Sequence, residues 1–130
     1  MNPDLKYLAY TALLTGSLWI PYVVAQSTTN GLLRPANYRD PAQRPLPLWG
    51  RRADRAYLNA VETFAPFAAL VVVAELTGHA NAMTAFWSMF VFAMRLTHAV
   101  VYLFGIPYVR TVVFTAGYLG IAGIGWEVLR

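Results

Sequence analysis

The chain has 130 residues, a length that suits a single domain. Hydrophobic residues make up 58% of it and charged residues only 12%, a composition that excludes most soluble domains and indicates a membrane protein. The net charge is +4 and there is no cysteine, which excludes disulfides, thiolate metal sites and a cysteine nucleophile.

Long intervals without a charged residue predict membrane-spanning helices, because about 20 consecutive apolar residues cross the hydrocarbon layer. The expected helices cover residues 5–26, 53–76, 81–104 and 108–128. The apolar run of the first is longer than the ~7–15 residues of a signal-peptide core, which argues against cleavage. Short turns at 77–81 and 105–107 predict that consecutive helices run antiparallel. The sequence therefore predicts an all-α, polytopic four-helix membrane bundle in which residues 1–130 form one domain.

The one long connection, residues 27–52, is rich in proline and arginine. Connections that carry an excess of arginine lie on the cytoplasmic side of membranes. We therefore expect this connection and the 105–107 turn to be cytoplasmic, with both termini and the 77–81 turn on the opposite side. Because the basic residues gather in a loop of this kind, the positive net charge does not indicate a nucleic-acid partner. The partner that the composition predicts is the lipid bilayer.

Polar and charged side chains gather at the same end of three of the expected helices. Within a helix they recur every three or four residues, which places them on one face. Ionisable residues inside a membrane span are costly and mark a functional site by default. The residues are Arg55, Asn59 and Glu62 in the second helix, Arg95, His98 and Tyr102 in the third, and Arg110 in the fourth. Their shared end predicts one common pocket.

Glu62 and Arg95 are expected at equal depth near the middle of the membrane, where an unpaired charge is severely penalised. This predicts an ion pair between them. One interpretation of the whole cluster is purely structural, a buried salt bridge with interhelical hydrogen bonds. The excess of arginine over carboxylate favours instead an anionic ligand held by guanidinium groups. His79 and His98 are too far apart in the sequence to indicate a metal site.

The fourth helix carries a stripe of small residues, Ala116, Gly120 and Gly123, with Gly117 beside it. Small side chains let two membrane helices approach closely. The stripe therefore predicts close packing against a neighbouring helix, within one subunit or between subunits, rather than a chemical role.

The motifs also resemble those of a known family. Residues 52–67 read R-A-D-R-A-Y-L-N-A-V-E-T-F-A-P-F. This is similar to the second-helix signature of the MAPEG proteins (membrane-associated proteins in eicosanoid and glutathione metabolism), R-A-H-x-N-x-x-E followed shortly by proline. Residues 95–102 and 107–111 resemble the end of the third helix and the start of the fourth in that family. The resemblance covers nearly the whole chain.

The resemblance implies a homotrimer of four-helix protomers that binds glutathione between neighbouring subunits, near the cytoplasmic face. It implies a glutathione-dependent transferase or peroxidase acting on lipophilic electrophiles or hydroperoxides that enter from the bilayer. The implied glutathione-binding positions are Arg34, Arg55, Asn59, Glu62, Arg95 and His98. The implied catalytic positions are Arg110, Thr111 and Tyr102. Arg110 is expected to stabilise the thiolate, because a nearby guanidinium favours the ionised form of a thiol.

Two positions depart from the family pattern. Tyr57 stands where the signature usually has histidine, and Leu58 stands where some glutathione-binding members have arginine. Because Leu58 removes a possible carboxylate contact, a rival interpretation is a non-enzymatic trimer that binds lipid or a partner protein. A second rival is a small transporter in which His98 and Glu62 relay protons. The short chain and the arginines suited to a thiolate argue against the transporter.

Overall fold

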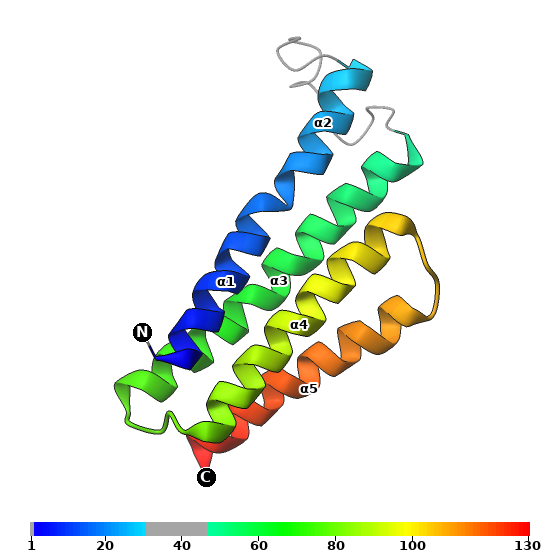
Figure 1. The fold of residues 1–130 in the computed structure, drawn as a ribbon. Helices are drawn as coiled ribbons and strands as arrows, with labels where there is room; N and C mark the ends of the chain where they lie inside the picture. Colours follow the sequence, from blue (N-terminus) through cyan, green and yellow to red (C-terminus); the bar gives the residue numbers. More distant parts are fainter. Residues whose placement is uncertain (1, 31–46) are drawn as a thin grey trace.

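The computed structural model describes residues 2–30 and 47–130. Arg34 and most of the 27–52 connection therefore lie outside the described residues. The described part is entirely helical, and its elements run roughly side by side as one bundle (Figure 1). They are α1 (Pro3–Ser17), α2 (Trp19–Asn30), α3 (Leu48–Leu76), α4 (Ala82–Phe104) and α5 (Val109–Leu129).

Four helical stretches are long and apolar enough to cross a membrane, with α1 and α2 together forming the first. They are Pro3–Thr28, Leu48–Leu76, Ala82–Leu103 and Val109–Leu129. The prediction of an all-α membrane bundle with four spans is confirmed. The N-terminus, the turn between α3 and α4 and the C-terminus lie at one end of the bundle, and the turn between α4 and α5 lies at the other (Figure 1). Which end faces the cytoplasm stays a prediction.

The first span is not the single helix that the sequence predicted. It breaks at Leu18, whose backbone N–H donates to the carbonyl of Thr15 at 3.3 Å as a closing turn of α1. Pro21 follows in the first turn of α2. A proline lacks an N–H and its ring collides with the carbonyl four residues earlier, so it fits the first turn of a helix better than the interior, where it kinks or breaks the helix. The break therefore lies just where Pro21 requires one.

The third element begins earlier than expected, at Leu48 after the cap residue Pro47. Arg51 and Arg52 thus belong to the first turns of α3, whereas the sequence analysis assigned them to the connection. Its inward face is formed by small residues such as Ala56 and Ala60, which are buried in the bundle. The start of α3 is therefore an arginine-rich helical segment at this end of the bundle.

The hydrophobic core lies towards the end that holds both termini. Phe67 and Val71 of α3, Val91 of α4 and Ile121 and Ile124 of α5 form one buried cluster. This core fixes how α3, α4 and α5 are rotated against one another. A smaller cluster of Leu18, Ala60 and Ala99 lies nearer the opposite end, where the polar side chains gather.

Two members of the small-residue stripe, Gly120 and Gly123, pack α5 against α4 within the chain. A methyl group built on Gly120 would lie 2.7 Å from Val91 Cγ2, and one built on Gly123 would lie 2.5 Å from the ring of Trp87. Contacts this short require a neighbour to move. Glycine at these two positions therefore sets the separation of the two helices that carry most of the polar cluster.

Replacing Gly123 with alanine is expected to destabilise the protein by about 1–3 kcal/mol, the usual cost of overpacking a tight contact. Gly125→Ala is the matched control, because the nearest atom to its methyl group would be Leu70 Cδ1 at a comfortable 3.7 Å. The control should be neutral or stabilising, since alanine favours helix over glycine by up to ~1 kcal/mol. Thermal unfolding in one detergent measures both variants. Equal stability of the two would contradict the packing described.

Candidate functional site

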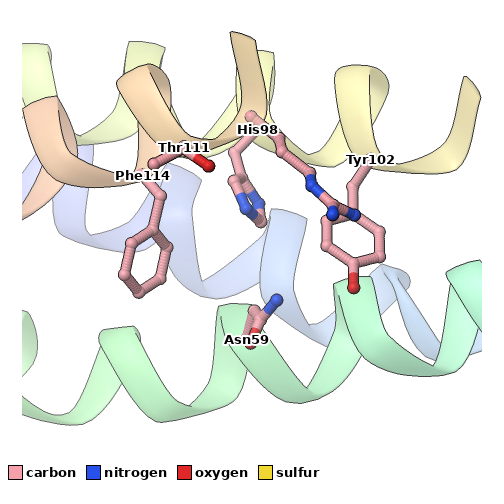
Figure 2. A pocket seen from close by; sticks show the side chains of 6 residues that line it. Asn59, His98, Tyr102, Thr111 and Phe114 are labelled. Carbon is pink, nitrogen blue, oxygen red and sulfur yellow. The ribbon is translucent and has the colours of Figure 1, made fainter. Parts of the chain in front are cut away.

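A polar pocket opens between α3, α4 and α5 at the end of the bundle where α4 turns into α5. Its volume is about 180 Å³. The side chains that line it are Asn59, His98, Tyr102, Arg110, Thr111 and Phe114. In Figure 2 the ring of His98 extends from α4 across the pocket towards Asn59 of α3. Helices distant in sequence thus place five polar side chains around one hollow.

The face of α4 that enters the pocket is held by aromatic contacts. The rings of His98 and Tyr102, one turn apart, have centroids 5.5 Å from each other. The ring of His98 also lies 5.7 Å from that of Phe114 on α5. Only 2% of the His98 surface is exposed. Packing on two sides gives this imidazole one orientation.

Behind His98 lies a buried cation. Arg95 is 5% exposed, its Nη2 lies 3.2 Å from Nδ1 of His98, and its guanidinium lies 5.8 Å from the centre of the Phe114 ring. Its Nε atom is buried and has no hydrogen-bond partner. Arg95 thus supports the pocket through His98 and does not line it.

The predicted ion pair between Glu62 and Arg95 is wrong for a single chain. Glu62 lies on the exposed side of α3, while Arg95 is buried between α4 and α5. Across residues 2–30 and 47–130, the ion pair that forms joins Glu127 and Arg130 at 3.5 Å. Equal depth along two helices does not fix their rotation. Here α3 turns Thr63 into the bundle, and this carries the neighbouring Glu62 outwards.

Arg110 lies at the rim of the pocket in the first turn of α5. Its guanidinium lies 5.3 Å from the centre of the Tyr102 ring, a cation–π contact that joins the end of α4 to the start of α5. The turn before it is unusual. Tyr108 has φ 65° and ψ −51°, and the N–H of Val109 donates to the carbonyl of Pro107 at 2.7 Å, which forms a γ-turn. A left-handed tyrosine is strained, and it directs α5 so that Arg110 faces Tyr102.

A second hollow adjoins the pocket, because Tyr102 and Arg110 line both spaces. It is lined by Leu48, Arg51, Arg52, Arg55, Tyr102 and Arg110. The guanidinium of Arg52 packs directly against Gly105, the left-handed residue that ends α4, and a side chain there would collide with it. Four guanidinium groups therefore surround one opening. The sequence analysis missed Arg51 and Arg52, although their three- and four-residue spacing from Arg55 on a helix was the available signal.

The structure brings together most of the residues that the sequence singled out. Asn59, His98, Tyr102, Arg110 and Thr111 line the pocket, and Arg55 lines the adjoining hollow. Glu62 alone points away, and Arg34 lies outside the described residues. Phe114, which was not anticipated, follows Arg110 by four residues and so lies on the same face of α5.

The sequence model of the MAPEG family matches residues 6–130, almost the whole chain. A comparison with curated proteins finds no significant match.

Proposed function

The chain belongs to the MAPEG family, and on that premise we propose that it is a glutathione-dependent transferase or peroxidase acting on lipophilic electrophiles or hydroperoxides. The family comprises membrane proteins of eicosanoid and glutathione metabolism. The observation that carries the proposal is the convergence of the family's glutathione-site positions from three helices on one pocket. Those that line it are Asn59, His98, Tyr102, Arg110 and Thr111.

The chemistry of the pocket suits glutathione as a co-substrate. The tripeptide carries two carboxylates, an ammonium group and a thiol. None of the six side chains that line the pocket is acidic, and the adjoining hollow adds Arg51, Arg52 and Arg55. Guanidinium groups hold carboxylates through paired, charge-assisted hydrogen bonds.

Glutathione would supply a sulfur nucleophile that displaces a leaving group from an electrophilic carbon or adds to an activated double bond. With a hydroperoxide, the sulfur would take the terminal oxygen as the O–O bond breaks and the alcohol leaves, and a second glutathione would then release water and form the disulfide. Arg110 holds a permanent positive charge beside the pocket and favours the ionised sulfur. Tyr102 lies under that guanidinium and restricts its movement. Thr111, the next residue of α5, offers a hydroxyl donor to the same region.

The lipophilic substrate class is supported by a groove on the outside of α5. Thr111, Val112, Thr115, Ala116 and Leu119 line a mostly apolar hollow of about 360 Å³. Thr111 also lines the polar pocket, so the two spaces adjoin at this residue. An apolar molecule dissolved in the bilayer would reach the reacting sulfur along this side of the helix.

The site also calls for a neighbouring subunit. Glu62 lies near the middle of α3 and is exposed. A carboxylate that faces lipid hydrocarbon is unfavourable and needs a polar partner. We therefore include a homotrimer in the proposal, in which the neighbour covers this face of α3 and glutathione binds between the two chains. The Glu62 carboxylate would then accept hydrogen bonds from the ammonium group of glutathione.

One observation favours a non-enzymatic MAPEG protein that binds lipid or a partner protein. Leu58 is 37% exposed and apolar, at the position where some glutathione-binding members have arginine. In such a protein the polar cluster would only join helices. The two functions differ in whether glutathione is consumed.

Turnover by the purified protein tests the proposal. A chromogenic aromatic electrophile reports conjugation, and loss of a lipophilic hydroperoxide with formation of oxidised glutathione and alcohol reports peroxidase activity. We expect glutathione-dependent turnover of at least one substrate. A folded protein that turns over neither at saturating glutathione and neutral pH would be the non-enzymatic kind.

A further inference from the structure

The contact between Arg95 and His98 defines where the proton of the imidazole resides. Arg95 Nη2 lies 3.2 Å from His98 Nδ1, in a region where both side chains are buried. A guanidinium has only donors, so Nδ1 must be the acceptor of this hydrogen bond. An imidazole accepts at Nδ1 only when it is neutral and carries its proton on Nε2.

Tyr118 of α5 is a further titratable group that acts on Arg95. No acidic side chain of the described ranges lies within ion-pair distance of Arg95. Phe114 packs against both members, with its ring centre 5.8 Å from the guanidinium and 5.7 Å from the imidazole. Tyr102 closes the other side of the imidazole. One donor of Arg95, on Nη2, is therefore directed at His98.

His98 also faces the pocket. His98 is one of the lining side chains, and its ring extends towards Asn59 (Figure 2). Arg110, a second cation that interacts electrostatically with His98, lines the same pocket. With Nδ1 engaged by Arg95, the free ring nitrogen is Nε2, and it meets the ligand as an N–H.

We propose that Arg95 is a positioning residue that fixes His98 as the Nε2–H tautomer, so that His98 is a permanent hydrogen-bond donor to the ligand and not a base. Its partner is an acceptor, such as a peptide carbonyl, a carboxylate oxygen or an ionised sulfur. The proton of a bound thiol therefore leaves by a route other than His98. The tautomer is a property of the free protein, and the identity of the ligand rests on the function proposed above.

Nitrogen-15 NMR of histidine-labelled protein tests the tautomer directly. The chain has two histidines, and His79 lies exposed at the opposite end, beside Thr77. His79→Gln therefore leaves a single labelled side chain. In ligand-free protein we expect a protonated Nε2 and an unprotonated Nδ1 from about pH 6 to about pH 8, a range in which a free histidine titrates. An imidazolium, or a proton on Nδ1, would overturn the proposal.

Two variants separate positioning from general structural support. Arg95→Met removes the donors at similar length and should give mixed tautomers. Arg95→Lys keeps a donor and should restore the Nε2–H signal. An Arg95→Met protein that is folded and still holds the wild-type tautomer would show that Arg95 does not set it.

Glutathione binding separates donor from base. His98→Ala should weaken affinity by roughly tenfold, the usual effect of losing one hydrogen bond to a charged group. His98→Gln, which keeps an N–H, should retain most of the affinity and all thiolate formation. If His98→Gln binds glutathione but forms no thiolate, His98 is a base and the proposal fails. If glutathione does not bind the wild-type protein while the tautomer is as expected, the proposed function fails and the positioning role of Arg95 stands.

Discussion

Replacing Arg110 with alanine is expected to remove most of the thiolate that forms when the protein binds glutathione. A cation within a few ångströms lowers the pKa of an acid by about 1–3 units. Removing it should therefore reduce the thiolate fraction at neutral pH by tenfold or more. Arg110 lies at the exposed rim and makes its described contact with the Tyr102 ring, so the fold should tolerate its loss. Ultraviolet difference absorbance on mixing protein and glutathione measures the thiolate.

Arg130→Ala is the matched control for this experiment. Arg130 is the cation at the other end of α5, where it pairs with Glu127 at 3.5 Å. Its removal should leave the thiolate signal unchanged. If Arg110→Ala binds glutathione and gives the wild-type signal, another residue stabilises the sulfur and the role assigned to Arg110 is wrong.

Glu62→Gln is expected to weaken glutathione binding by roughly 10- to 100-fold. A hydrogen bond to a charged group contributes about 1.5–3 kcal/mol, and each 1.4 kcal/mol is a factor of ten. Within the single chain Glu62 is exposed and does not pair with Arg95, so the change breaks no described contact. Calorimetric titration with glutathione measures the affinity.

A glutathione analogue without the ammonium group is a sharper control than a second variant. Glutaryl-cysteinyl-glycine lacks the ammonium group of glutathione, so wild type and Glu62→Gln should bind it with similar affinity. Glu75→Gln changes a carboxylate at the other end of the same helix and should bind glutathione normally. An equal loss for both ligands would mean that Glu62 shapes the site without contacting the ammonium group.

The spans and the end of the bundle that carries the site could be predicted from the sequence. Intervals without charged residues predict the membrane-spanning segments, and helical spacing places His98 and Tyr102 on one face of their helix. Rotation about the helix axis could not be predicted, because it depends on packing between helices. Asn59 turns into the pocket while Glu62, three residues later, turns out.

Local backbone features could not be predicted from the sequence pattern either. The break at Leu18 precedes Pro21 by three residues, and the γ-turn at Tyr108 directly follows Pro107. A proline alone does not determine on which residue the backbone will deviate. Arg51 and Arg52 read as loop residues because proline precedes them, although α3 begins directly after Pro47. In the proposed homotrimer, what covers Glu62 depends on a second chain, which no single-chain pattern encodes.

Determining the structure of the protein with glutathione present tests the central claim most directly. We expect density for the tripeptide in the pocket lined by Asn59, His98 and Arg110, with its sulfur beside Arg110 and its carboxylates towards Arg51, Arg52 and Arg55. A neighbouring chain should close the site over Glu62. A pocket without glutathione at saturating concentration, or glutathione bound elsewhere, would contradict the account.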